Sequence, residues 1–524
     1  MPKYNNHMFG FRCPASVIRV SGIKEKRDSL MKRKMVAFWL VLSLLLFTVY
    51  AGAEETIIVN PESAPGTAEE TAAMVDAVLK ETMESTEIQS FFADEVTVVT
   101  ETVPSDWYAD EPQTVYTLRH GGEKLRFMKE TVGEADESGR YPIYITLHGG
   151  GGGPEEMNND QWIDMFHYYR NSVENGIYVA VRGVSDTWDL HFREETYPLL
   201  DELITYMSVM EHADQNRVYL LGFSAGGDGV YQLAPRLADR FAAVNMSSGH
   251  PNGVSLLNTA NCPICLQAGI RDYYTEDAKR SVRCAEFEKT LEDYRDKYGF
   301  GYEHQVWIHV PEGHNYIDYA DSHGLVLADP TAFAEREEAE DMLTAMLQVT
   351  QEKLDTDDII YLSYWVYGDD EAFDQAVTSL VGDTFGLELA EANTNAVRWV
   401  SQYVRNPVPP ELVWDLGTRA AGREITSWYW LEAEPSVNTG IIRASFDSAS
   451  NTYTVIPDEA VNGDFAILFL AGMVDTGRPV TLITPKGKYT LQVNPSEKLA
   501  LESFRERMDP DMICVGKILY SDIK

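Results

Sequence analysis

A serine stands between two glycines in the segment Gly222-Phe223-Ser224-Ala225-Gly226, directly after the apolar run "RVYLL". The residues beyond it favour a helix, so the segment predicts a strand that turns at once into a helix. A serine in such a turn adopts strained backbone angles that project its hydroxyl above the sheet edge. Glycines two positions away on either side prevent a clash where strand and helix approach. The pattern predicts Ser224 as a nucleophile.

A serine hydroxyl attacks well only when a base takes its proton. For a nucleophile on this kind of turn, an acid and then a histidine follow in chain order. His314 is the predicted base, because it lies in the loop "PEGHNY" after a predicted strand, with a flexible glycine just before it. The other histidines considered are placed less well; they are His304 and His309 on the strand itself, His323 farther along, and His250 without a suitably placed acid.

Asp272, in "LQAGIRDYYTED", is the predicted acid, because it comes just past a strand's end on the side expected to face His314. Its role would be to fix the imidazole tautomer and to balance the imidazolium charge. Glu276 and Asp277 are the alternatives, although their position suits capping of the next helix better.

The glycine run in "TLHGGGGGP" follows another predicted strand. Consecutive glycines leave their backbone N–H groups unobstructed, so Gly150 and Gly151, together with Ala225, are predicted to form an oxyanion hole. The alternative is a phosphate-binding loop. It is disfavoured because neither a Gly-Lys-Ser/Thr motif nor a GxGxxG helix start with a ribose-binding acid follows.

Three further residues are candidates for the substrate pocket. Trp162 and Trp188 follow strands whose ends should face the site, and either could wall an acyl or aromatic pocket or simply pack. Asp228, just beyond the serine turn, could bind a substrate amine, but capping of a backbone turn is the favoured interpretation.

The elements that must position these residues are indicated by a regular alternation between Tyr141 and about Ile317. Short β-branched runs alternate with helical stretches such as Tyr197–His212 and Glu276–Tyr298, which predicts an α/β fold, doubly wound, with a mostly parallel sheet covered by helices. A β-hairpin is expected just before it, over Thr114–Gly133. The predicted strands are 141–147, 177–183, 217–222, 242–248, 264–269 and 304–310.

The flanking regions have other patterns. Residues 54–110 are an acidic lead-in with a helix over Thr67–Thr86, 111–328 form the catalytic domain, 329–405 look helical with a second helix over Glu388–Tyr403, and 406–524 form a small antiparallel β-rich domain. In that last domain Trp428 and Trp430 could bind carbohydrate from one strand face, with core packing the commoner fate.

The first 53 residues are predicted to contain a leader. From Met31 a basic stretch precedes 15 uncharged residues, Val36–Tyr50, and then Ala51-Gly52-Ala53. This layout is typical of a secretory signal, and its apolar run is shorter than the ~20 residues of a spanning helix. We expect cleavage, secretion and no stable membrane span in the mature form. An uncleaved anchor is the alternative, and residues 1–30 are an upstream extension.

Charge and cysteine content narrow the partners. Without residues 1–53 the chain has 34 Lys/Arg against 80 Asp/Glu, a net charge of −46. So negative a surface repels nucleic acid and anionic lipid head groups. No metal or cofactor is expected, because no four ligands gather at close spacing. We expect one structural disulfide or none among Cys262, Cys265 and Cys284; Cys13 lies in the leader and Cys514 is remote.

These motifs together resemble the α/β-hydrolase superfamily, in its secreted bacterial carboxylesterase and prolyl-oligopeptidase-like branch, near polyester depolymerases and feruloyl esterases. The resemblance covers about Thr114–His323. It implies the roles of nucleophile, orienting acid and base for Ser224, Asp272 and His314. One departure is "YYTED" after the acid, where simpler esterases have a Val-Pro pair. The segments that carry the resemblance are "LHGGGGGP", "VRGVSDTWD", "GFSAGGDGVY", "GHPNG" and "GIRD…GHNY".

The favoured function is a serine hydrolase that cleaves small-molecule or carbohydrate-linked carboxylic esters. A peptidase with the same triad is the first alternative. Peptidases of that branch usually carry a propeller domain, and the residues before 114 are too few to form one. A non-catalytic binding protein on the same fold is the second alternative.

Overall fold

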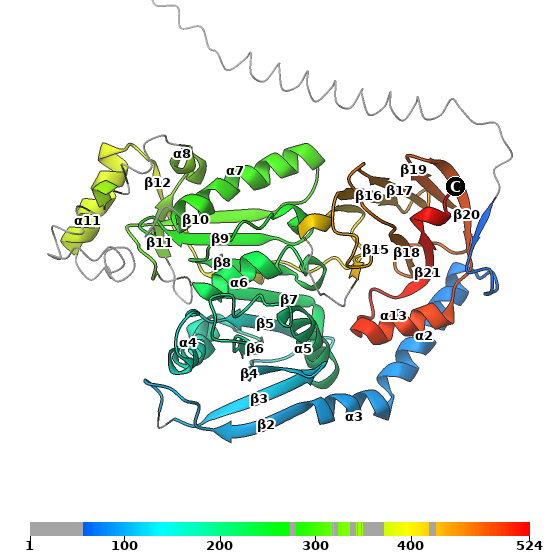
Figure 1. The fold of residues 1–524 in the computed structure, drawn as a ribbon, viewed down its shortest axis with the longest axis horizontal. Coiled ribbons are helices and arrows are strands. Elements are labelled where there is room, and N and C mark those ends of the chain that lie inside the picture. Colours follow the sequence, from blue (N-terminus) through cyan, green and yellow to red (C-terminus); the bar gives the residue numbers. More distant parts are fainter. Residues whose placement is uncertain are drawn as a thin grey trace, which may run out of the picture. The chain divides into compact units, whose positions relative to one another are not determined.

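The largest element of the computed structural model is a mixed sheet with the strand order β12-β11-β10-β9-β8-β7-β5-β6-β4-β3-β2 (Figure 1). The described residues are 56–109, 111–272, 279–316, 318, 323–335, 342, 344–346, 348, 371–418 and 426–524. The predicted leader and the alternative acids Glu276 and Asp277 lie outside them.

The centre of this sheet is parallel and coincides with the predicted runs. Adjacent strands from β6 to β10 all pair in parallel. Every residue of β6, β8 and β9 is buried, as expected for strands covered on both faces. The prediction of an α/β fold with a mostly parallel sheet is therefore confirmed. The central strands, in spatial order, are β6 (Gly176–Val181), β5 (Tyr141–Leu147), β7 (Ala213–Phe223), β8 (Ala243–Ser247), β9 (Ile264–Gly269) and β10 (His304–Val310).

Alternation along the strands divides the core into two layers. In β5, Ile143, Ile145 and Leu147 pack into the cluster that also contains apolar residues of α5 (Thr196–Met210), α6 (Ala225–Leu233) and α7 (Arg280–Tyr298). Tyr144, between them, packs into the opposite cluster with residues of α4 (Glu155–Tyr168) and α12 (Ala396–Val400). Successive side chains of a strand point to opposite faces of the sheet, so helices cover the apolar residues of β5 on both faces.

Antiparallel strands extend both edges of the sheet. The predicted hairpin is present as β3 (Gln113–His120) and β4 (Glu123–Val132), and β2 (Val96–Glu101) pairs with β3. At the other edge, β11 (His323–Leu327) pairs with β10 and with β12 (Leu389–Asn393).

The expected helix over Glu388–Tyr403 is wrong in its first half. Residues Leu389–Asn393 form β12, and α12 begins only at Ala396. The segment "LELAEAN" favours a helix locally, but its backbone groups pair with β11, and such tertiary pairing overrides a weak local preference. The other described helices of the region 329–405 are α8 (Pro330–Ala334) and α11 (Glu371–Ser379), which continues into a π-helical turn, η5 (Leu380–Thr384).

The C-terminal region contains two further sheets, with orders β1-β20-β19-β17-β16-β13 and β14-β15-β18-β21. Their pairings are mostly antiparallel, but β17 pairs with β19, and β1 with β20, in parallel. The chain's first described strand therefore completes a C-terminal sheet. The strands are β1 (Ile57–Val59), β13 (Glu411–Asp415), β14 (Ser427–Trp428), β15 (Leu431–Glu432), β16 (Ile441–Asp447), β17 (Thr452–Pro457), β18 (Ala466–Leu470), β19 (Val480–Thr484), β20 (Gly487–Val493) and β21 (Cys514–Leu519).

Two helices accompany these sheets. The helix predicted over Thr67–Thr86 is α2 (Ala68–Met83), capped by reciprocal hydrogen bonds between Thr67 and Glu70, and it lies against α13 (Glu497–Arg507) (Figure 1). A further helix, α3 (Thr86–Glu95), leads from α2 into β2. Among the described helices, none combines the length and the apolar character required to cross a bilayer.

The two tryptophans considered for carbohydrate binding are both buried. Trp428 stacks on Trp414, and Trp430 donates its Nε1–H to the Pro409 carbonyl at 2.8 Å. They therefore pack in the core of the C-terminal region and present no face to a sugar.

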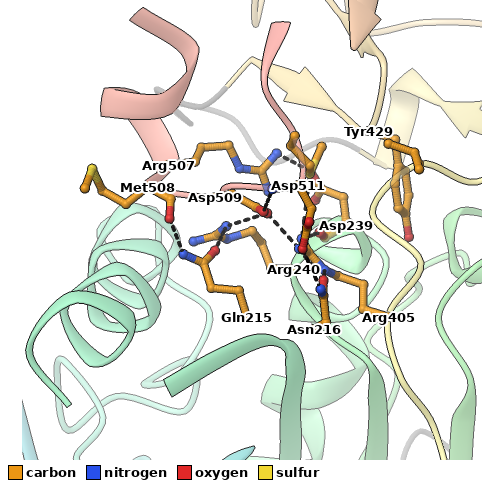
Figure 2. Close-up of polar contacts among 12 residues, drawn as sticks. Gln215, Asn216, Asp239, Arg240, Arg405, Tyr429, Arg507, Met508, Asp509 and Asp511 are labelled. Atoms are coloured by element: carbon orange, nitrogen blue, oxygen red, sulfur yellow. Dashed lines mark hydrogen bonds and ion pairs between the residues drawn. The ribbon is translucent and has the colours of Figure 1, made fainter. Parts of the chain in front are cut away.

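An ionic network joins the C-terminal region to the large sheet's domain (Figure 2). Its ion pairs are Arg240–Asp201 at 2.5 Å, Arg405–Asp509 at 2.7 Å and Arg507–Asp239 at 2.7 Å. We call these six residues the interface cluster; each is at most 5% exposed. Charges that are buried so completely must be paired, because an unpaired charge away from water costs several kcal/mol. Residues Thr56–Lys524 form one compact unit.

Candidate active site

Ser224 is the single residue between β7 and α6, with φ 57° and ψ −120°. This backbone conformation is unfavourable for a residue with a side chain and must be held by its surroundings. The Ser224 N–H donates to the Ser247 carbonyl at 2.9 Å, and its carbonyl accepts from the Asp228 N–H at 3.0 Å. The strained turn predicted from the sequence is thus present.

Both flanking glycines are required by close backbone contacts. A Cβ atom at Gly222 would lie 2.2 Å from the Gly226 carbonyl oxygen, and one at Gly226 would lie 2.0 Å from the Leu147 carbonyl oxygen. No side chain fits at such distances. The spacing of the motif therefore follows from the approach of α6 to β7 and β5.

The structure brings together the three residues proposed as a triad. The Ser224 hydroxyl lies 2.9 Å from His314 Nε2, and His314 Nδ1 lies 3.0 Å from Asp272 Oδ2. A carboxylate can only accept, so Nδ1 carries the hydrogen and Nε2 is left to accept the serine proton. Asp272 is fully buried and His314 is 6% exposed, whereas Ser224 is partly exposed. Of these three residues, Ser224 is therefore the one that a substrate can reach.

Asp272 is positioned by the end of β9 and the start of α7. Its N–H donates to the Gly269 carbonyl at 2.9 Å, and its own carbonyl accepts from the Ser281 N–H at 3.2 Å. The guanidinium of Arg280 lies 3.8 Å from its Oδ1 and supplies an opposite charge. This buried carboxylate therefore has both a hydrogen-bond donor, His314, and a cation beside it.

The glycine run lies beside the serine. A Cβ atom at Gly149 would lie 3.3 Å from Ser224 Cβ, and Gly150 and Gly151 adopt left-handed backbone angles with φ 96° and 85°. The Gly151 N–H donates to Asn158 Oδ1 at 2.7 Å. The expected oxyanion role of Gly151 is therefore corrected, because its N–H is already bonded to Asn158 of α4.

Two of the expected oxyanion donors are not used by other groups in the described part of the chain. Ala225 is the first residue of α6, and an N–H at that position has no acceptor within its own helix. In the described part of the chain, no hydrogen bond uses the Gly150 N–H. We retain Gly150 and Ala225 as the candidate oxyanion donors.

Two histidines that sequence reasoning missed support this loop. His148 donates its Nδ1–H to the Gly149 carbonyl at 2.6 Å, while its Nε2 accepts from the Gly183 N–H at 3.0 Å. His191 donates to the His148 carbonyl at 2.8 Å. Burial lowers the pKa of His148 well below its usual range and that of His191 to about 3, so both rings are neutral. The position of His148 directly before the glycines was the available signal.

The pocket candidates have three different fates. Trp162 is fully buried on α4 and donates to the Ala180 carbonyl at 2.9 Å, so its expected pocket role is wrong. The carboxylate of Asp228 accepts from the His250 N–H at 2.6 Å and from the Asn252 amide at 3.0 Å, which is the capping alternative. Trp188 is 59% exposed, and its Cα would lie 3.3 Å from a Cβ at Gly151, so it stands beside the glycine loop.

The alternative bases are occupied elsewhere. His309 is buried on β10 and donates to Gln267 Oε1 at 2.8 Å, and His304 contacts the Tyr302 carbonyl at 2.7 Å. His323 is exposed on β11, and the ring of His250 contacts Asn252. The described cysteines, Cys262, Cys265, Cys284 and Cys514, are buried free thiols. Within the described ranges no cluster of His, Cys, Asp and Glu side chains could hold a metal ion.

No family model matches the chain. Over 115 residues the chain is 30% identical to a protein of Aspergillus terreus (strain NIH 2624 / FGSC A1156) described as probable feruloyl esterase C. The match covers 22% of this chain and 42% of that protein, so the chain spans less than half the length of this curated relative.

Solved structures also show similarity. A thermostable esterase is 16% identical, with 48% of this chain and 63% of that chain covered and a TM-score of 0.29. LpqC, a poly(3-hydroxybutyrate) depolymerase from Bordetella parapertussis, is 18% identical, with 43% and 86% covered and a TM-score of 0.28. A ferulic acid esterase is 16% identical, with 42% and 92% covered and a TM-score of 0.26.

Proposed function

We propose that the chain is a serine hydrolase of the α/β-hydrolase superfamily that cleaves carboxylic esters through an acyl-enzyme intermediate. The observation that carries the proposal is the unbroken contact from the Ser224 hydroxyl through the His314 imidazole to the Asp272 carboxylate. An oriented imidazole within hydrogen-bond distance of a strained serine is the arrangement that activates a hydroxyl.

The residues would act in the following order. His314 Nε2 takes the proton as Ser224 Oγ attacks the acyl carbon, and Asp272 balances the charge of the imidazolium that forms. The N–H groups of Ala225 and Gly150 stabilise the oxyanion, at about 3 kcal/mol for each donor. The imidazolium then gives its proton to the leaving alcohol oxygen, and water releases the acyl group by the same steps.

The substrate class follows from the same proposal. Small-molecule and carbohydrate-linked carboxylic esters are favoured, in keeping with the curated relative's description as a feruloyl esterase. The strongly acidic chain remains a poor partner for nucleic acid and anionic membranes. Export by the leader predicted in residues 31–53 is part of the proposal, and N-terminal sequencing of secreted protein should find a start near Glu54.

A labelling experiment tests the activity. A fluorophosphonate probe should label the full chain, and Ser224→Ala should abolish labelling. Ser448→Ala, at an exposed serine of the C-terminal region, is the matched control and should label normally. Labelling that survives Ser224→Ala would contradict the assignment of the nucleophile.

A substrate panel tests the ester preference. p-Nitrophenyl acyl esters should be hydrolysed faster than aminoacyl anilides with matched acyl groups. Faster turnover of the anilides would replace the esterase proposal by a peptidase with the same triad.

A further inference from the structure

Asp318 is a fully buried carboxylate that the proposed reaction does not use. It follows His314 in the segment "HNYID". Its Oδ2 accepts hydrogen bonds from the Tyr169 hydroxyl at 2.8 Å and from the Ser247 hydroxyl. The loop that carries the proposed base is therefore bonded, through Asp318, to two other parts of the catalytic domain.

Each partner of Asp318 also holds part of the active site. Ser247 ends β8, and its carbonyl accepts from the N–H of the nucleophile, Ser224, at 2.9 Å. Tyr169 is the C-terminal cap of α4, the helix that binds the glycine loop through Asn158. Asp318 thus connects the base loop to the strand end below the nucleophile and to the helix behind the glycine loop.

The hydrogen bonds that reach Asp318 have a single direction. His309 Nε2 donates to Gln267 Oε1 at 2.8 Å, and the Gln267 amide donates to Asn245 Oδ1 at 2.9 Å. The Asn245 amide in turn donates to the Ser247 hydroxyl at 2.8 Å. Because Ser247 Oγ accepts from Asn245, its own hydrogen points to Asp318. The chain ends on an oxygen that must be an acceptor.

The base loop has supports besides Asp318. The Ser248 hydroxyl donates to the His314 carbonyl at 2.7 Å, and the Tyr168 hydroxyl donates to the Tyr316 carbonyl at 3.2 Å. Both of these bonds hold the loop backbone through neutral groups. The Asp318 carboxylate is the charged link in this set, so a substitution there should disturb the loop without releasing it entirely.

We propose that Asp318 is a positioning residue, whose ionised carboxylate holds the base loop so that His314 Nε2 stays within reach of the Ser224 hydroxyl. The proposal rests on the proposed hydrolase function. It makes a second carboxylate, beyond Asp272, necessary for full activity. Asp318 would act through the loop, without contact to substrate.

The groups around Asp318 make its charge state decisive. Burial raises the pKa of Asp318 to about 6. The phenols and the thiol near Asp318 are neutral around that pH, because burial raises the pKa of each well above its usual value; they belong to Tyr168, Tyr169, Tyr178, Cys265 and Tyr316. His309, which begins the chain of hydrogen bonds, is also neutral, because burial lowers its pKa to about 3.

Protonation of Asp318 would weaken the hydrogen bonds from the two hydroxyls that converge on it, because they would no longer be made to a charged acceptor. Activity would therefore require the ionised carboxylate of Asp318, and the acid limb of kcat/KM against pH should contain its titration. In Asp318→Asn the amide cannot titrate, so the acid limb should have a smaller slope than in the wild type.

The experiment measures hydrolysis of a p-nitrophenyl ester by the full chain between about pH 4 and pH 9. Asp318→Ala should lower kcat about 10²-fold with little change in KM, and Asp318→Asn about tenfold, since a small displacement of a reacting group has effects of this size. An acid limb that keeps the wild-type slope in Asp318→Asn would overturn the proposal, whatever the loss of activity.

A matched pair of tyrosines controls for damage to the buried cluster. Tyr169 and Tyr178 are both fully buried, but only the Tyr169 hydroxyl is bonded to Asp318, whereas that of Tyr178 donates to the Met165 carbonyl. Tyr169→Phe should lower kcat severalfold, and Tyr178→Phe should leave it unchanged. Equal losses in the two variants would count against the proposal.

Hydrogen exchange separates this proposal from the proposed function. In Asp318→Ala, the amides of residues 312–316 should exchange about tenfold faster than in the wild type, while those of β9 stay protected. If the wild type shows no hydrolysis that depends on Ser224, the proposed function fails, and the exchange rates still decide whether Asp318 holds the loop. Unchanged exchange in residues 312–316 would overturn the positioning role.

Discussion

The active site and the interface cluster both bury carboxylates, but they compensate the charge in different ways. In the interface cluster every aspartate faces an arginine, and three cations match three anions. Around Asp318 the donors are neutral hydroxyls, and Asp272 has a hydrogen bond with His314 Nδ1 and a more distant arginine, Arg280, beside it. Full pairing stabilises a junction, whereas incomplete pairing leaves a group able to change its protonation state.

Two aspartates make the contrast direct, because Asp509 and Asp318 are at most 1% exposed. Burial alone would raise the pKa of Asp509, but Arg405, Arg240 and Arg507 outweigh it and hold that pKa below its usual value. Burial raises the pKa of Asp318 to about 6, and the hydroxyl donors offset only part of this increase. The neighbours, and not the depth of burial, decide the direction of the shift.

Replacement of the proposed base, His314, should have the largest effect on activity and almost none on stability. His314→Gln should lower kcat about 10⁶-fold, because the serine loses its proton acceptor. The free energy of unfolding should change by about 1 kcal/mol or less. Ester hydrolysis and urea unfolding of the same preparation measure both. A variant that retains a tenth of the activity would contradict the assignment.

Replacement of one arginine in the interface cluster should lower the stability of the protein and leave its activity unchanged. Arg405→Met should lower the free energy of unfolding by about 3 to 5 kcal/mol, because Asp509 is left buried without its closest cation. The activity of the folded protein should be unchanged. Urea unfolding measures the stability.

Two variants sharpen that test. Arg478→Met removes an exposed pair with Asp475 and should cost less than about 1 kcal/mol. Replacement of Arg405 and Asp509 together by Met and Leu should recover part of the loss, since no unpaired charge then remains. An equal loss in the double variant would show that packing, and not charge, governs the junction.

The dependence of stability on pH should reveal Asp318. Its pKa in the folded state lies above its unfolded value, so the folded state binds the proton more tightly, and this contribution to stability is lost as the pH rises through about 6. Between about pH 4 and pH 8 the wild type should lose roughly 2 kcal/mol relative to Asp318→Asn. Parallel urea unfolding of both proteins measures the difference, and a constant difference would refute the shift.

Trp188 should show the smallest effect on stability. Trp188→Ala removes an exposed ring beside the glycine loop and should change the free energy of unfolding by less than about 0.5 kcal/mol. A measurable effect is expected in the KM of esters with bulky acyl groups and none in that of acetyl esters. Trp162→Ala, at a fully buried ring, is the contrast and should cost about 3 to 5 kcal/mol.

Local patterns in the chain were sufficient to predict much of this molecule. The parallel strands, the hairpin before them and the serine turn all follow from short-range rules, namely period-two burial, strand–helix alternation and glycine at sites of close backbone approach. The same rules named Ser224, Asp272 and His314 before their contacts were known. They could not predict β12 from the helix-favouring segment "LELAEAN", because its pairing with β11 is a tertiary contact.

What remained for the tertiary structure to decide was the pairing of groups far apart in sequence. The sequence determined which residues could react and on which turns they would stand, since those properties depend on neighbours within a few positions. It could not show that the Gly151 N–H is already bonded to Asn158 or that Trp162 is fully buried. Nor could it show that Asp318 accepts hydrogen bonds from the hydroxyls of Ser247 and Tyr169. Burial and hydrogen bonding are properties of the packed molecule, and they exist only once distant segments meet.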